Sequence, residues 1–390
     1  MLTIEPFQRR WLLTFGATLA LLLSGAVALS LRLPSFREPA FNFYAMQPGQ
    51  IFNVYGLTRR QEGSVKLGFA EAYPAPEIGA YGNHIIAFFG ADAFDRPEEA
   101  EYFFNYYYAN LSLPEIRRYL LRVARLNHLP KKLILVQVTP PNADNGGAII
   151  DRGNELPPDV LLSSREDDRG LDGPLPLMAL SWELISNWLH EILNYNTVVM
   201  SLFQRGGYEE RTLSPANCHE NPPAWLSRLP VMLQSRLGTY GGLRCVPRLW
   251  SGALRRDGSQ LVAGPETRTP LVQNENALKE TERALRAGDE QKIAHEMQAI
   301  DAIGRRYGVK VVFIVPPVYE TDRHDSVVNQ ILDRALALVP DVAVVDHRNL
   351  HSDASLFEGG IHASAQYYRI LVEELRRRGV VNSASRNQND

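Results

Sequence analysis

Short, nearly continuous apolar runs alternate with amphipathic segments in two parts of this chain, and this alternation constrains the fold more than any other feature. Apolar runs typical of strands buried on both faces occupy residues 84–89, 132–138, 310–315 and 342–345. Apolar side chains at helical spacing occupy residues 113–127, 275–307, 326–338 and 364–378. Because strands that alternate with helices need crossover connections, the sequence predicts an α/β fold with a parallel sheet.

The domain organisation follows from where this alternation stops. Residues 34–82 have no clear period and are predicted to be a stalk that leads into an α/β domain at residues 83–381. Within that domain, residues 142–273 are rich in Pro and Gly and are predicted to be an insertion, helical at 177–193. Four tryptophans lie there, either as the insertion's own small core or over the sheet edge where such folds bind ligands. The polar tail, residues 382–390, is predicted to be disordered.

The N-terminus carries a membrane-targeting pattern. Residues 11–31 contain no charged side chain, and a helix of that length spans about 30 Å of hydrocarbon. Arg9 and Arg10 precede the run, so the positive-inside rule predicts a single-pass anchor in residues 1–33 with the remainder outside the cytoplasm. A cleaved signal peptide, with Ala26-Val27-Ala28 as its cleavage pattern, and a buried core helix are the alternatives.

Charge and cysteine content exclude several classes of partner. Lys and Arg number 41 against 44 for Asp and Glu, and this net charge of −3 gives no attraction for nucleic acid. No Walker or dinucleotide fingerprint is present, so no cofactor is predicted. In an oxidising compartment Cys218 and Cys245 would pair as a disulfide, and two buried thiols are the alternative. Cys218-His219 offers too few ligands for zinc, so no metal site is predicted.

Candidate chemistry lies where strands end. The segment Gly90-Ala91-Asp92 follows the first apolar run, and His362 stands just before the last helix, where an imidazole can act as an acid or base. A histidine there can equally be a capping or core residue. Tyr106-Tyr107-Tyr108 form either an aromatic platform for a sugar or part of the core.

The order of these parts resembles the SGNH (GDSL-like) hydrolase superfamily, and within it the membrane-anchored cell-envelope branch of the D-alanyl transfer and alginate O-acetylation proteins. The resemblance covers about residues 80–142 and 275–380, and its motifs are short. They are a strand ending in Gly-x-x, the Val315-Pro316-Pro317 strand end, and Phe357-x-x-x-x-His362 before an amphipathic helix. The resemblance implies a three-layer, flavodoxin-like sheet and a bacterial cytoplasmic-membrane protein with an extracytoplasmic domain.

The family's functional positions match only in part. The family uses a serine two residues after the glycine of the first strand and an Asp-x-x-His whose histidine activates it. His362 matches, but position 92 is Asp92, Gly359 replaces the acid, and Glu358 is the nearest carboxylate. Asn142 stands where the family places an oxyanion-hole asparagine.

These departures leave two hypotheses. Asp92 cannot be activated as a serine is, so the first hypothesis is a membrane-anchored protein that lacks the nucleophile. It would bind a glycan or an assembly protein in cell-envelope polysaccharide synthesis or acylation, with an Asp92–His362 ion pair closing the crevice. The alternative is an acyl- or acetyltransferase or esterase, with Asp92 as general base, His362 as acid and Asn142 as donor.

Overall fold

The computed structural model describes residues 14, 15, 17, 18, 40–52, 59–96, 99–108, 111–138, 212–213, 253–260, 288–317, 327–358 and 362–381. The chain divides into two compact units. One consists of residues 40–172 and 206–390 and contains every element considered below. In the other, residues 1–39 with 173–205, only residues 14, 15, 17 and 18 are described.

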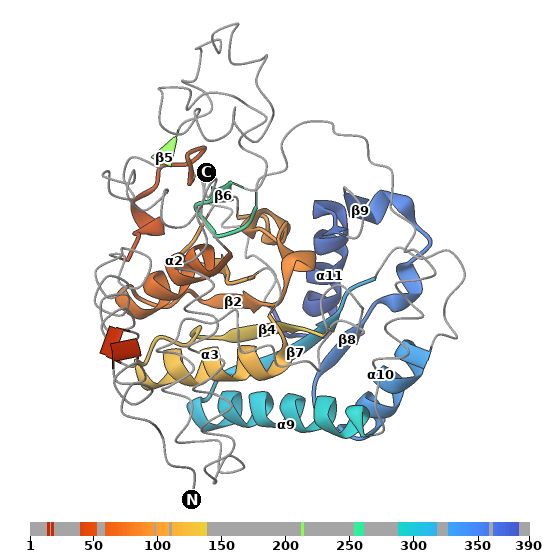
Figure 1. Ribbon diagram of the computed structural model, residues 1–390. Helices are drawn as coiled ribbons and strands as arrows, with labels where there is room; N and C mark the ends of the chain where they lie inside the picture. Colours follow the sequence, from red (N-terminus) through yellow and green to blue (C-terminus); the bar gives the residue numbers. More distant parts are fainter. Residues whose placement is uncertain are drawn as a thin grey trace, which may run out of the picture. The chain divides into compact units, whose positions relative to one another are not determined.

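A parallel five-stranded sheet lies at the centre of the larger unit (Figure 1). From edge to edge its strands are β3 (Phe103–Asn105), β2 (Ile78–Tyr81), β4 (Leu133–Gln137), β7 (Lys310–Val315) and β8 (Val344–Asp346). In register, Ile78 pairs with Leu133, which pairs in turn with Lys310. All residues of β2, β3 and β4 are buried, as helices on both sheet faces require. The α/β fold is confirmed.

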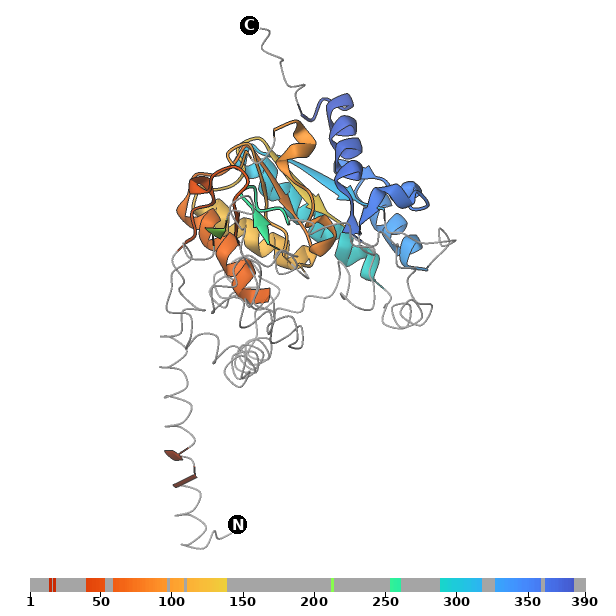
Figure 2. The same cartoon turned by 90° about the horizontal axis from the view of Figure 1, so that it is seen from above.

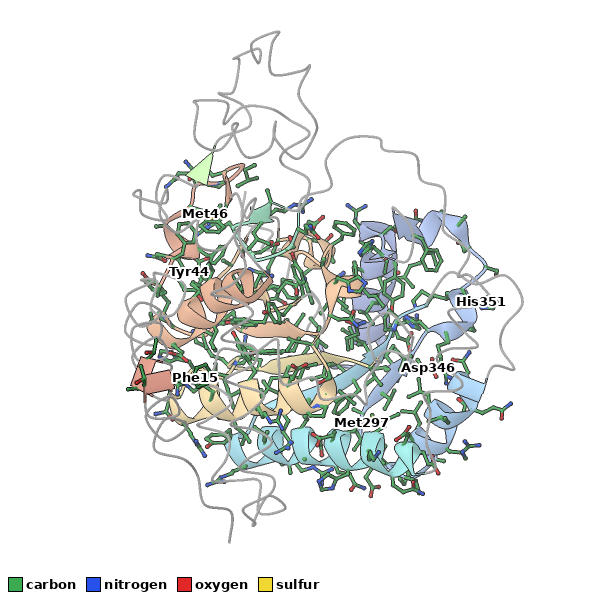
Figure 3. All side chains as sticks on the ribbon, viewed as in Figure 1. Phe15, Tyr44, Met46, Met297, Asp346 and His351 are labelled. Atoms are coloured by element: carbon green, nitrogen blue, oxygen red, sulfur yellow. The ribbon has the colours of Figure 1, made fainter. Side chains whose placement is uncertain are left out.

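Helices cover both faces of the sheet. On one face α3 (Leu113–Arg125), α9 (Asp289–Tyr307) and α10 (Val327–Ala337) lie side by side. On the other face are α2 (Arg59–Ala72) and α11 (Ala365–Arg377), which Figure 2 shows set apart from each other. Figure 3 shows side chains filling the space between the layers, including Met297 of α9, which is fully buried. The predicted helices over 113–127, 326–338 and 364–378 and strands over 132–138 and 310–315 are confirmed, and β8 begins two residues after the predicted start of its strand.

Local sequence accounts for these helix ends. α3 begins after Ser112, whose backbone N–H donates to Glu115 at 2.9 Å in a capping box, and Pro114 stands in its first turn. α9 has two acidic residues in its first turn and two arginines in its last, which complements the helix dipole. It ends at Tyr307, and the next residue, Gly308, has a φ of +70°, a conformation that favours glycine.

Gly304 lets α9 approach β7 closely. A Cβ atom at this position would lie 2.3 Å from Cγ2 of Val311 and 2.6 Å from the carbonyl oxygen of Val309. We therefore expect Gly304→Ala to lower the free energy of unfolding by about 1–3 kcal/mol, despite the better helix propensity of alanine. Urea denaturation measures this, with the exposed Gln298→Ala of the same helix as control. A variant as stable as the wild type would contradict so tight a contact.

The structure corrects the prediction of a stalk over residues 34–82. From residue 40 onward this segment contributes β1 (Ile51–Phe52), α2 and β2 to the larger unit. β1 forms a small antiparallel sheet with β5 (Thr212–Leu213) and β6 (Leu254–Arg255), both from the predicted insertion. The rings of Phe43, Phe69 and Phe104 pack beneath them, with centres 4.5–5.3 Å apart. Aromatic packing orders a segment whose sequence shows no period.

The strand predicted over residues 84–89 is also wrong, because His84–Ile86 forms a 3-10 helix, η3, after β2. Three backbone carbonyls of residues 84–89 accept hydrogen bonds from side chains instead of from a neighbouring strand. Tyr368 donates its hydroxyl to the carbonyl oxygen of Ile85 at 2.9 Å, and Asn105 donates to those of Ile86 at 2.7 Å and Phe89 at 2.9 Å. The segment is apolar because it is buried. It has no neighbouring strand, so hydrogen bonds from side chains satisfy its buried backbone carbonyls.

His347, directly after β8, is a half-buried titratable group. Its backbone N–H donates to the carbonyl oxygen of Val315 at 2.9 Å, and its ring lies perpendicular to that of Tyr367, with centres 5.7 Å apart. Its Nδ1 atom is buried without a hydrogen-bond partner among the described residues. Burial lowers the pKa of the His347 imidazole below 6.5, while Glu374 opposes the shift.

A lowered pKa in the folded state makes stability depend on pH. The unfolded chain takes up a proton at His347 near pH 6.5 before the folded protein does, so the contribution of the neutral ring is complete above that pH. It is lost as the pH falls through the lower pKa of the folded state. We expect the urea midpoint to fall between pH 7.5 and 5.5, and to fall less in His347→Asn. His295→Asn, at an exposed position of α9, should keep the wild-type slope.

Candidate functional site

The sheet has its topological switch between β2 and β4. From β2 the chain passes to β3 on one side, and it then returns to β4 on the other side. In open parallel sheets, the crevice beyond the carboxyl ends of two such strands is the usual ligand site. Here these ends are Tyr81, followed by Gly82, Asn83 and His84, and Gln137.

Asn83 and Gln137 join the two strand ends through their side chains. The Gln137 amide donates to Oδ1 of Asn83 at 3.0 Å, and Oε1 of Gln137 accepts from the backbone N–H of Asn83 at 3.0 Å. Oδ1 of Asn83 also accepts from the backbone N–H of Ile85 and so caps η3. Gly82 leaves no room for a side chain, since its Cβ would lie 2.4 Å from Oε1 of Gln137. These contacts fix the backbone on which His84 stands.

His84 follows the joined ends of β2 and β4, and its ring contacts that of His362. Their ring centres are 5.3 Å apart, with an angle of 72° between the planes. Phe88 contacts His362 from another side, with ring centres 5.4 Å apart. All three side chains are half-buried. The structure thus brings the predicted His362 to a histidine that the sequence analysis did not single out.

The C-terminal segment positions His362. β9 (Phe357–Glu358) and β10 (His362–Ala363) pair as antiparallel strands, with Glu358 opposite His362 in the register. Ser364 then caps α11: its backbone N–H donates to the carbonyl oxygen of Leu356 at 2.8 Å, and its hydroxyl accepts from the N–H of Tyr367. Because Tyr368 of α11 donates to η3, the helix that follows β10 and His362 also holds the turn that bears His84.

Asp92 has a different neighbour from the one predicted. It lies in the 3-10 helix η4 (Ala91–Phe94), and its Oδ1 is 3.6 Å from a guanidinium nitrogen of Arg255 in β6. The partner in this ion pair therefore comes from the predicted insertion, whereas His362 packs against His84 and Phe88. Both partners are about a quarter exposed, so the pair contributes little to stability.

A buried polar cluster beside Asp92 escaped the sequence analysis. Asp257, which is fully buried, accepts from the N–H of Ala91 at 2.6 Å, from the N–H of Ser259 at 3.0 Å and from its hydroxyl at 2.5 Å. Lys66 of α2 donates to the carbonyl oxygen of Gly258 at 3.0 Å. The bond to Ala91 joins residues 253–260 to the loop that follows β2, and the bond from Lys66 joins them to α2.

The three successive tyrosines are part of the core. Tyr106, Tyr107 and Tyr108 are each only 3% exposed, so the aromatic-platform hypothesis is wrong and the core alternative is confirmed. Tyr106 stacks on Tyr81 with ring centres 4.9 Å apart, and Lys66 lies over the ring of Tyr107 at 3.3 Å.

Several predicted features lie outside the described residues. These are Asn142, Cys218, Cys245, the side chain of Glu358, the insertion's tryptophans, the polar tail, and all of residues 11–31 except 14, 15, 17 and 18. Among the residues that are described, no helix combines the length and apolar character needed to cross a membrane. The anchor stays a prediction.

Comparison with known proteins adds no family assignment. A scan against protein-family models finds none that matches the chain, and a search of curated proteins finds no match.

The position of His84 could have been found in the sequence. Gly82-Asn83 is a turn signal directly after Ile78, Gly79, Ala80 and Tyr81, and it marks the end of a strand. The longer apolar run that follows obscured it.

Proposed function

We propose that the larger unit is a flavodoxin-like, three-layer domain of the SGNH type. When the five strands of this sheet are numbered in the order in which they occur along the chain, their order across the sheet is 2-1-3-4-5. This is the doubly wound order that flavodoxin has. The resemblance of the C-terminal segment, with His362 before the last helix, supports the same assignment.

The observation that carries the proposal is the identity of His84. The superfamily's serine stands two residues after the glycine that follows the first strand. With β2 ending at Tyr81, that glycine is Gly82 and the position is His84, not Asp92. The contact between the rings of His84 and His362 supports this alignment, because nucleophile and histidine are neighbours in such enzymes.

A histidine in place of the serine removes the acyl-transfer chemistry of the superfamily. No hydroxyl is present at position 84 for His362 to activate, and Gly359 cannot orient the imidazole as the missing acid would. We therefore propose a non-catalytic component of cell-envelope polysaccharide synthesis or acylation, held at the outer face of a bacterial cytoplasmic membrane by residues 11–31. Its ligand is a glycan or an assembly partner, and the half-buried ring of Phe88 is suited to stack on a sugar face.

The test combines reactivity with binding. The full-length chain is incubated with a serine-directed fluorophosphonate and with p-nitrophenyl acetate, and we expect no covalent adduct and no turnover above that of His362→Ala. We also expect retention on O-acetylated oligosaccharides, weakened in Phe88→Ala and unchanged in Tyr307→Ala, at an exposed aromatic residue of α9. A serine adduct would contradict the loss of the nucleophile, and turnover that depends on His362 and Asp92 would instead establish the rearranged enzyme. Absence of glycan retention would contradict the glycan-binding role.

A further inference from the structure

Three helices that lie side by side, α3, α9 and α10, end at one edge of the sheet (Figure 1). They lead into β4, β7 and β8, and the strands of a parallel sheet all begin at the same edge. Leu133 pairs with Lys310, so the starts of β4 and β7 are neighbours. The surface formed by these helix ends and strand starts is called the amino edge below. It lies at the other end of the strands from His84.

Three large apolar side chains are exposed at the amino edge, one at the end of each helix. Leu126 follows α3 and is 40% exposed, and Tyr307 ends α9 and is 38% exposed. Leu338 follows α10 and is 47% exposed. Among the described residues of the larger unit, no other large apolar side chain is exposed. Exposed apolar side chains that gather on one face of a protein mark an interaction surface.

Basic side chains surround these apolar ones. Six exposed cations lie at the ends of α3 and α9 and around the starts of β4 and β7: Arg125, Lys131, Lys132, Arg305, Arg306 and Lys310. Three carboxylates lie among them. Glu77 pairs with Lys132 at 2.8 Å. Asp301 pairs with Arg305 at 2.6 Å, and Asp341 follows α10. The amino edge is therefore positive, although the whole chain has a net charge of −3. The helix dipoles favour the arginines, but they do not account for the lysines at the strand starts.

Apolar side chains surrounded by lysine and arginine are suited to the surface of an anionic bilayer. The apolar groups enter the boundary between headgroups and acyl chains, and the long basic side chains reach the lipid phosphates. A hydrophilic acidic polymer would match the charge but would leave Leu126 and Leu338 in water. We propose that the amino edge docks on anionic phospholipid headgroups.

Docking by the amino edge sets the direction in which the candidate site faces. The strands run from this edge to the carboxyl ends where His84 contacts His362. The site therefore faces away from the bilayer, toward the side from which a glycan or an assembly protein approaches. The inference is carried by the exposed side chains of the amino edge, and it holds whether or not residues 11–31 form an anchor.

Lysine acetylation of the full-length chain tests the inference without any substitution. The chain is mixed with nanodiscs of phosphatidylcholine alone or with about 30% phosphatidylglycerol, and mass spectrometry measures how fast sulfosuccinimidyl acetate modifies each lysine. We expect Lys131, Lys132 and Lys310 to react about threefold more slowly with the anionic discs, and about 0.5 M NaCl to restore their rates by screening. Lys292, in the first turn of α9, is the internal control and should react equally in both samples. Equal rates at the three lysines in the two samples would overturn the proposal, and so would an equal slowing of Lys292.

Two charge-reversal pairs test whether the basic side chains are responsible. Lys131→Glu with Arg306→Glu changes exposed positions of the amino edge, and it should make Lys310 equally reactive with neutral and anionic discs. Lys292→Glu with Arg369→Glu makes the same charge change at exposed positions elsewhere and should keep the slowing of Lys310. Slowing that survives in both pairs would overturn the proposal. If soluble polygalacturonate slows the lysines of the amino edge and anionic discs do not, this edge binds an acidic polymer and the lipid proposal is wrong.

Discussion

Asp257→Ala is expected to lower the free energy of unfolding by about 3–5 kcal/mol, because it removes a buried carboxylate that accepts three hydrogen bonds. Without that carboxylate, the N–H groups of Ala91 and Ser259 and the Ser259 hydroxyl lose their acceptor in a region closed to water. Asp257 itself is 0% exposed, so solvent cannot replace it. Urea denaturation followed by intrinsic fluorescence measures the loss.

Two companion variants separate the buried hydrogen bonds from a general effect of charge. Asp257→Asn keeps one acceptor oxygen and is expected to lose about 1–3 kcal/mol. Asp341→Ala removes a carboxylate from an exposed position and should change stability by less than about 0.5 kcal/mol. Equal losses at Asp257 and Asp341 would show that the buried cluster contributes nothing special.

Tyr368→Ala is the second large effect, with an expected loss of about 3–5 kcal/mol. The Tyr368 ring is fully buried and stacks on Phe89 with ring centres 4.5 Å apart and planes at 8°. Its hydroxyl donates to the carbonyl oxygen of Ile85, so the substitution opens a cavity and also releases the turn that carries His84. Thermal and urea unfolding, with near-ultraviolet circular dichroism of the folded state, report both consequences.

The hydroxyl and the ring of Tyr368 can be tested apart. Tyr368→Phe keeps the ring and is expected to lose about 1 kcal/mol, the value of one hydrogen bond. Tyr307→Ala, at a tyrosine that is 38% exposed on α9, should have little effect. A Phe variant as unstable as the Ala variant would mean that the hydroxyl bond, and not the ring, holds α11 to η3.

The sequence predicts the fold correctly where a buried apolar segment is also a paired strand. β4 and β7 are apolar on both faces and end at turn signals, so their sequence pattern follows directly from their place in the sheet. β2 has four residues including a glycine, and the longer apolar run after it forms η3. An apolar pattern indicates that a segment is buried. It does not indicate which groups bind the backbone N–H and C=O groups of that segment.

The residues of the candidate site could also be predicted from the sequence only in part. His362 could be placed because it precedes a helix with a clear period. His84 was missed because the longer apolar run after Gly82-Asn83 hid the end of β2, and its contact with His362, 278 positions away, leaves no local signal. The bond between Asp257 and Ala91 spans 166 positions and leaves no local signal at either end. Contacts of this kind appear only when the chain is folded.

The pairing of β4 with β7 has a consequence for how the protein is made. Leu133 pairs with Lys310, so the seam through the middle of the sheet joins strands that are separated by the whole insertion. At about 5–20 residues per second of synthesis, the nascent chain carries β4 for roughly 10–35 seconds before β7 exists. During that interval the open backbone edge of β4 has no native strand to pair with. We expect folding yield to depend on chaperones that shield this edge, more than on the intrinsic stability of the finished domain.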